Sequence, residues 1–312
     1  MQIIQPAQYN SFLIDNDPAL VILDHLGGVD INYRSPVLNR LSNLTARRDI
    51  TVITEYIVNQ QIKDNYPNFN FVFSVKDHND VLDHFQNYRI HPSLTFENFL
   101  CSFNGSAHVS RKLLVSILNN FGLFDPKYSS KNFVFSKDTI DGHISDYVGD
   151  RNRFYNKFFS ANLAFYNTIH SFGHERFAHS KNIYTLERQL TGSFVHLVSE
   201  TMATSYYPFY GEKFLYSIIT RGLFVAYSQP LWHDMLERCY GFKKYTRLFN
   251  YNFDTIVNPV ERLLELVTML NKFSKLSSEA LRDLYELELE TIEYNYNHYF
   301  SQDYLTCLEK FR

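Results

Sequence analysis

Glu212 and Lys213 have the residue types and the position to bind a nucleotide. They follow the turn Tyr210-Gly211 and begin a segment with helical spacing. The first turn of a helix presents unpaired N–H groups and a positive dipole, which favour a phosphate there. Lys213 adds a point charge for a pyrophosphate, and the Glu212 carboxylate can accept hydrogen bonds from both hydroxyls of a ribose. A glutamate in a first helical turn is also common for dipole reasons alone, so both interpretations stay open.

Two apolar segments flank this pair and are typical of buried parallel strands. Residues 194–199 (FVHLVS) end directly before Glu200, and residues 223–227 (LFVAY) follow the helical segment. In α/β proteins, ligands bind outside the carboxyl ends of such strands. We therefore expect Glu200 to lie beside the Glu-Lys pair, and Tyr210 to offer an aromatic face to the same ligand.

The segment from residue 193 to residue 262 resembles the C-terminal half of the fucosyltransferase-type GT-B glycosyltransferases, a family with viral and bacterial members. The motifs that carry the resemblance are, in order, Glu200-Thr201, Glu212-Lys213, residues 223–225, Gly241-Phe242, Asn252-Phe253-Asp254 and Pro259-Val260-Glu261-Arg262. The chain departs from the family at Phe214, where Thr or Leu is usual, and at residues 250–252, which replace most of an acidic segment. The resemblance therefore concerns the nucleotide-sugar site more than the identity of the sugar.

The resemblance implies an α/β fold of the GT-B type, with two Rossmann-like domains that face a cleft and a C-terminal helix that often packs across the N-terminal domain. It also implies that Glu212 and Lys213 bind the ribose and the phosphates of a nucleotide-sugar donor. In the family, a basic residue of the N-terminal half can reach the phosphates, and Arg111 is the candidate here; a solvated charge at a helix start is the alternative. The expected reaction is hexosyl or pentosyl transfer with inversion, without a metal or another cofactor.

An inverting transfer needs a base that removes the proton of the acceptor hydroxyl. Asp24 and His25 follow the first apolar strand and precede Gly27-Gly28. The rule that ligands bind at the carboxyl ends of strands places both residues at the cleft. Asp24 is the first candidate for the base and His25 the second, although Asp24 could instead bind N–H groups of its own loop.

The rest of the chain alternates between strand-like and helical patterns, which indicates parallel sheets. The expected strands are residues 19–26, 69–75, 96–103 and 132–135, residues 49–58 suit either a strand or a helix, and the expected helices are residues 108–121 and 279–300. We predict an N-terminal acceptor-side domain (1–175), a nucleotide-sugar-binding domain (176–273) and a C-terminal helical segment (274–312).

Composition narrows the class of protein. The net charge of −3 and the pI of about 6.5 give no global attraction for nucleic acid or an anionic membrane. Three widely spaced cysteines favour a reducing compartment. No signal peptide or membrane-spanning run is recognisable, so we expect a cytoplasmic protein of a bacterium or of a virus-infected cell, without a membrane partner.

Two further groups of residues could carry chemistry. A histidine-rich stretch contains His170, His174, Glu175 and His179, but it lacks the order of a zinc hydrolase, and we predict no metal site. A small basic patch at residues 243–247 could meet a polyanionic acceptor, although such patches are usually plain surface.

Three functions remain open from the sequence. The first is a glycosyltransferase that acts on a glycan or a small hydroxyl acceptor. The second is a glycosyltransferase that modifies hydroxymethylated pyrimidines in viral DNA, which requires a basic face across the cleft. The third is a glycan-binding protein without enzymatic activity. The sugar, the nucleobase, the acceptor, the linkage and the oligomeric state are not encoded in a pattern that can be read directly.

Overall fold

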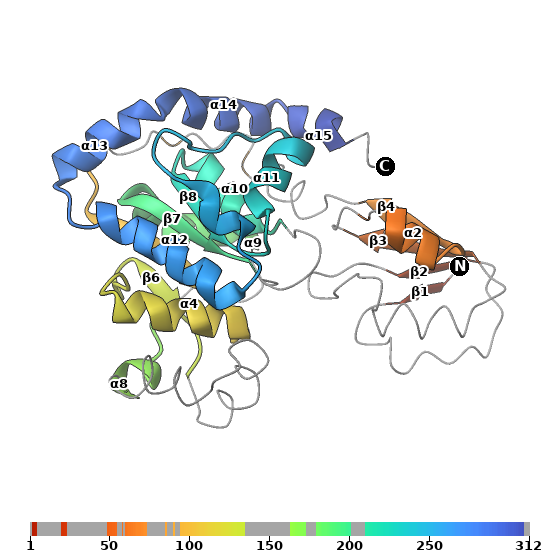
Figure 1. Cartoon of the computed structure of the whole chain (residues 1–312), viewed down its shortest axis with the longest axis horizontal. Coiled ribbons are helices and arrows are strands. Elements are labelled where there is room, and N and C mark those ends of the chain that lie inside the picture. Colours follow the sequence, from red (N-terminus) through yellow and green to blue (C-terminus); the bar gives the residue numbers. More distant parts are fainter. Residues whose placement is uncertain are drawn as a thin grey trace.

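The computed structural model describes residues 2–4, 20–23, 49–54, 58, 60–73, 85, 90, 94–134, 163–172, 179–200 and 210–308. Within these ranges the chain forms an α/β protein with two separate sheets of four parallel strands each (Figure 1). No helix in the described ranges combines the length and the apolar character needed to cross a bilayer.

The first sheet is built from strands that follow one another in chain order. Its strands are β1 (Gln2–Ile4), β2 (Leu20–Leu23), β3 (Asp49–Thr54) and β4 (Phe69–Phe73), and helix α2 (Gln60–Asn65) lies between β3 and β4. The β-branched residues of β3 favour a strand over a helix because their side chains are restricted at χ1, which resolves the ambiguity at residues 49–58. The predicted strands in this region are confirmed, with shorter bounds.

The second sheet has the strand order β6-β5-β7-β8, and all neighbours are parallel. Its strands are β5 (Asn98–Asn104), β6 (Ser129–Lys131), β7 (Ser193–Ser199) and β8 (Leu223–Tyr227). Every residue of β7 and β8 is buried, as expected for parallel strands of a sheet that is covered on both faces.

Helices cover both faces of the second sheet. Helix α4 (Val109–Asn120) contacts β7 and packs against α12 (Pro259–Phe273) on one face. Helices α9 (His179–Thr191) and α10 (Glu212–Ile219) contact β7 and each other. In Figure 1, α4 and α12 lie together on one side of the sheet, and α10 lies on the other. The apolar residues of these helices form one continuous core with the sheet.

The C-terminal helices pack on this same α/β body. The predicted helix at residues 279–300 is in fact two helices, α13 (Ser278–Leu287) and α14 (Leu289–Phe300), which are followed by α15 (Asp303–Leu308). Among the described residues, α14 contacts α10, and α15 contacts the π-helical turn η2 (Leu236–Tyr240). In the described part of the chain these helices therefore pack on the body of the second sheet; the packing across an N-terminal domain that the resemblance implies stays a prediction.

The second sheet also crosses the boundary that we predict at residues 175 and 176. Leu100 of β5 pairs with Val195 of β7, and Ser102 pairs with Ser129 of β6. The strands β5 and β6, which the sequence analysis assigns to the acceptor-side domain, thus share a sheet with β7 and β8. Local patterns cannot reveal this pairing, because a parallel partner is reached through a long crossover.

Candidate functional site

The strand order of the second sheet defines where a ligand is expected. After β5 the chain crosses to β6 on one side of β5, and after β7 it crosses to β8 on the other side. The connections therefore diverge between β5 and β7, which is the topological switch point of the sheet. In open α/β sheets, the crevice outside the carboxyl ends of the strands at such a point is the usual binding site.

The β5 side of this point contributes His108 and Arg111. β5 ends at Asn104, and α4 begins at Val109, with His108 as the residue before its first turn. Arg111 lies in the first turn and is buried. Its Nη2 donates a hydrogen bond to the backbone oxygen of Ser199, at a distance of 3.3 Å.

The β7 side contributes Glu200, Glu212 and Lys213. Lys213 Nζ donates to the same Ser199 oxygen at 3.4 Å and lies 3.8 Å from Glu212 Oε1. Two cations that are far apart in the sequence therefore meet on one carbonyl oxygen. We call His108, Arg111, Glu200, Glu212 and Lys213 the switch-point cluster.

Burial and mutual charge shift the pKa values of this cluster. The pKa of Lys213 is lowered, first by burial and then by the Arg111 guanidinium, against the opposing effect of Glu212 and Glu200. Burial raises the pKa of Glu200 to about 7, although Lys213 opposes the shift. An anion that contacts Arg111 and Lys213 would be stabilised by both cations, against the repulsion of Glu212 and of the ionised form of Glu200.

Glu212 and Lys213 keep limited access to solvent. Their side chains are 20% and 16% exposed, and α10 begins at Glu212, as the sequence predicts. A carboxylate and an ammonium thus lie together at the start of α10, beside the switch point.

Glu200 is buried and hydrogen-bonded to the residue that precedes α10. It is only 1% exposed, and its Oε1 accepts a hydrogen bond from the Gly211 N–H at 3.2 Å. This bond ties the end of β7 to the residue that precedes α10. We therefore assign Glu200 to positioning Lys213 rather than to contact with a ribose.

Tyr210 is a core residue in the structure and does not offer its ring to a ligand. The side chain is 2% exposed, and its hydroxyl donates to the backbone oxygen of Trp232 at 3.0 Å. Its ring lies 4.9 Å from Trp232 and 4.5 Å from Tyr240. The aromatic packing under α10 removes Tyr210 from the expected donor site.

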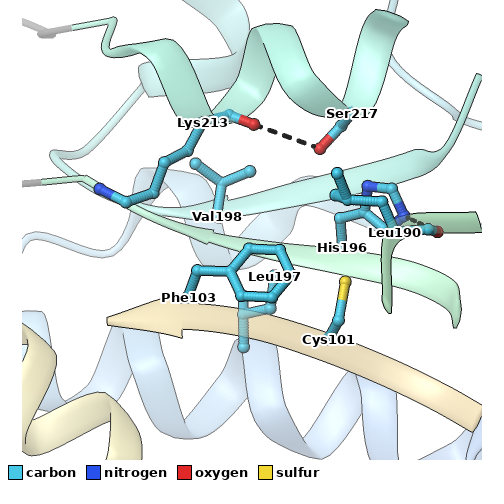
Figure 2. A pocket seen from close by; sticks show the side chains of 8 residues that line it. All are labelled: Cys101, Phe103, Leu190, His196, Leu197, Val198, Lys213 and Ser217. Atoms are coloured by element: carbon cyan, nitrogen blue, oxygen red, sulfur yellow. Dashed lines mark hydrogen bonds between the residues drawn. The ribbon is translucent and has the colours of Figure 1, made fainter. Parts of the chain in front are cut away.

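A small pocket lies between the sheet and α10, next to the cluster (Figure 2). It has room for about one water molecule, and Cys101, His196 and Ser217 are among the residues around it. In Figure 2, the Lys213 side chain extends away from Ser217, and its amino group lies toward the arrowhead of β5. The pocket is therefore a packing feature, and the charged end of Lys213 belongs to the crevice instead.

Asp254, from one of the motifs on which the expected resemblance rests, organises the core. Its carboxylate accepts hydrogen bonds from the His233 N–H at 3.0 Å and from His233 Nδ1 at 2.9 Å. His233 Nε2 in turn accepts the Ala226 N–H of β8 at 3.0 Å. Both imidazole nitrogens are thus engaged, so this His-Asp pair holds β8 and is not an acid–base pair.

Arg262, from the last of these motifs, is another buried organising residue. Its guanidinium donates to the backbone oxygens of Ser228 and Val257, each at 3.0 Å. The Asn258 side chain accepts from the N–H groups of Val260 and Glu261, and Pro259 occupies the first turn. The motif thus caps α12 and fixes the loop after β8.

Several predicted residues lie outside the described residues. These are Asp24, His25, Thr201, His174 and Glu175. His170 is described, and its backbone pairs with Lys131 through two hydrogen bonds of 2.9 and 3.1 Å. Among the described residues, no group of three or more His, Cys, Asp or Glu side chains is arranged to hold a metal ion.

Two of the three basic residues at positions 243–247 are paired with carboxylates, and the third, Lys243, lies over the ring of Tyr294. Lys244 is paired with Asp234 and Glu237, and Arg247 lies 3.3 Å from Glu290. A patch that is paired in this way offers little charge to a polyanion.

The sequence analysis gave no role to two residues at the end of β5. Asn104 is fully buried, and its Oδ1 has no hydrogen-bond partner in the described part of the chain, although its Nδ2 donates to Ser102 and Ser130. His108 lies four residues further on. Asn104 directly follows a predicted strand, and His108 lies in the turn between that strand and the next helix, which is the signal that could have identified them.

Comparisons of the chain with protein-family models, curated proteins and solved structures gave no match. The fold and the site are therefore defined by the described residues themselves: a doubly wound parallel α/β sheet with a charged cluster at its switch point.

Proposed function

We infer that this protein is a glycosyltransferase that binds a nucleotide-sugar donor at the switch-point cluster and transfers the sugar to a hydroxyl acceptor. The observation that supports the inference most strongly is the convergence of Arg111 and Lys213 on the Ser199 carbonyl, at the carboxyl ends of β5 and β7. A diphosphate would replace that shared neutral acceptor with charged oxygens, which form stronger hydrogen bonds.

Each part of the donor has a candidate partner. Lys213 and Arg111 would bind the diphosphate, and the first turn of α10 would add its N–H groups. Glu212 would accept the ribose hydroxyls. Glu200 would hold the end of β7 against Gly211, so that Lys213 stays in place.

The proposed reaction is a direct displacement with inversion. The acceptor oxygen attacks the anomeric carbon, the bond from that carbon to the phosphate oxygen breaks, and the acceptor proton passes to a base. Asp24 and His25 remain the candidates for this base. Negative charge develops on the departing diphosphate, and Arg111 and Lys213 would stabilise it without a metal ion.

The proposed architecture is of the GT-B type, in which the first sheet lies on the acceptor side and the second sheet binds the donor. A glycan or a small hydroxyl compound is the proposed acceptor. No observation on the described residues favours DNA, because Lys244 and Arg247 of the basic patch are paired with carboxylates.

Thermal denaturation with UDP, GDP, CMP and dTDP tests the donor site. A nucleotide at about one hundred times its dissociation constant stabilises the folded state by about 2.7 kcal/mol. We expect one nucleotide to raise the melting temperature of the wild type and to have no effect on Lys213→Ala. Lys272→Ala, which removes an exposed lysine from α12, is the matched control and should respond like the wild type.

Two outcomes would contradict the proposal. If no nucleotide shifts the melting temperature, the cluster is not a nucleotide site. The second assay incubates the protein with sugar conjugates of the nucleotide that binds and with glycan or small-molecule acceptors. If no free nucleotide is released, the protein is a binding protein and not a transferase.

A further inference from the structure

His108 is placed to join Arg111 and Lys213 on one ligand. It lies between the end of β5 and the first turn of α4, one helical turn before Arg111, and its side chain is exposed. The imidazole makes no capping hydrogen bond to α4, although it occupies the capping position. A side chain at this position that is not used by the helix is available to a ligand in the crevice.

The charges around His108 oppose its protonation while the crevice holds no anion. Although His108 is exposed to solvent on one side, the protein removes water from the other side of the imidazole, and this desolvation, followed by the charges of Arg111 and Lys213, lowers the pKa of His108 to about 4. The other charged groups of the cluster are Glu212 on α10 and Glu200 at the end of β7. The imidazole is therefore neutral at pH 7 in the free protein.

A diphosphate reverses this balance. It places about two negative charges beside Arg111, Lys213 and the neutral imidazole of His108, and an opposite charge within a few ångströms favours the charged form of an imidazole. We propose that His108 takes up one proton from solvent when the donor's diphosphate enters the cluster, and that the resulting imidazolium donates a hydrogen bond to a phosphate oxygen.

This role rests on the proposed donor site and adds two properties to it. Since the bound state holds one more proton than the free state, the affinity for a diphosphate rises as the pH falls through the range between the two pKa values of His108. The same imidazolium would also stabilise the charge of the departing nucleoside diphosphate. His108 thus binds phosphate and becomes charged only when the diphosphate is bound.

The direct test follows the imidazole signal of His108 by NMR, with inorganic pyrophosphate as the probe. At pH 6, we expect the Cε1–H resonance to move from the neutral to the imidazolium position when pyrophosphate saturates the site. His108→Gln identifies the resonance by its loss. His170 does not belong to the cluster, and burial and Lys131 lower its pKa; it is the internal control and should not respond.

Calorimetry supplies a second readout. We expect His108→Gln to weaken pyrophosphate binding by about tenfold at pH 6 and clearly less at pH 8, since one charged hydrogen bond is lost only where the histidine would be protonated. Glu200 also titrates near neutral pH, so Glu200→Gln is measured in parallel and should keep the pH dependence. Thermal melting of each variant verifies that it is folded.

The inference is overturned if pyrophosphate saturates the site while the His108 resonance stays at its neutral position, or if pyrophosphate does not bind at all. Failure of the proposed function gives a different result. In that case the His108 signal responds to pyrophosphate as expected, but no nucleotide sugar is consumed.

Discussion

Buried polar side chains in the second α/β body are mostly held by backbone atoms. His196 Nε2 donates to the Leu190 oxygen at 2.7 Å, and the Lys131 ammonium donates to the oxygens of Phe133 and Tyr166 at 3.3 and 3.2 Å. Such groups are costly to disturb, because a lost partner leaves a buried donor or acceptor unsatisfied. The consequences can be measured one residue at a time.

Gly222 packs so closely against His196 that no side chain fits. A Cβ atom on Gly222 would lie 2.1 Å from His196 Cε1. We expect Gly222→Ala to lower the free energy of unfolding in urea by about 2 to 3 kcal/mol, since the buried ring cannot move aside. In a double-mutant cycle with His196→Ala, the cost of the added methyl group should fall.

Gly105→Ala is the control for this experiment. A Cβ atom on Gly105 meets nothing within 4 Å, so its effect should stay within about 0.5 kcal/mol. Equal effects of the two substitutions would show that backbone freedom, and not the contact with His196, explains the requirement for glycine.

The stability of the protein should depend on pH through His196. Burial lowers the pKa of His196 to about 4, below the ordinary value of about 6.5. The unfolded chain therefore binds the proton more readily than the folded chain. The contribution of His196 to the free energy of unfolding is complete above pH 6.5 and is lost as the pH falls toward 4. We expect this residue alone to account for about 2 kcal/mol between pH 7 and pH 5.

Urea unfolding of the wild type and of His196→Gln at both pH values checks this number. Glutamine keeps a donor for the Leu190 oxygen but does not titrate. If the two proteins lose the same stability between pH 7 and pH 5, His196 is not the responsible group.

At the level of elements, polar side chains of α14 and of the residue before it form hydrogen bonds with the backbone of residues 240–247. Glu288, at the break between α13 and α14, accepts the Arg247 N–H at 2.6 Å. The Asn295 side chain binds both backbone groups of Lys243, at 2.7 and 3.0 Å. The break between α13 and α14 thus places the Glu288 carboxylate against the loop at Arg247. The spacing of the leucines does not reveal this break.

Two glutamates on either side of this break form a matched pair for mutation. Glu288→Ala leaves the Arg247 N–H without its partner, and we expect a loss of about 2 kcal/mol. Glu290→Ala removes an ion pair whose carboxylate is 80% exposed, and it should cost no more than about 0.5 kcal/mol. Chemical denaturation of both variants measures the difference, and similar losses would contradict the role of Glu288.

At the level of the whole molecule, the second sheet determines which part of the chain can fold alone. β7 pairs with β5 on one edge, and α4 covers one of its faces. Phe85 is fully buried in the core of this body, so the unit extends N-terminal to β5.

We expect a fragment of residues 84–312 to unfold cooperatively. A fragment of residues 176–312, which follows the predicted boundary, lacks β5 and α4 and should stay unfolded, because an edge of β7 and a face of the sheet remain uncovered. Circular dichroism melting of both fragments tests this, and a cooperative transition in the shorter one would restore the predicted boundary.

Local patterns in the sequence were sufficient for most elements and for part of the site. The bounds of β8 and the start of α10 at Glu212 follow from apolar runs and first-turn residues. Tyr210 was assigned to the ligand because an aromatic residue beside a Glu-Lys pair suits a donor site. Its burial depends on Trp232 and Tyr240, which only the tertiary packing brings to it.

The sequence by itself determined that strands alternate with helices and that a carboxylate and an ammonium begin α10, because these features depend on neighbours within a few residues. Only the tertiary structure decided that Arg111 meets Lys213 on the Ser199 carbonyl, across a separation of 88 residues from Arg111 to Ser199. The reason is that the packing of the long crossover connections on the sheet sets the order of the strands. The hydrophobic periodicity of each segment does not depend on that order.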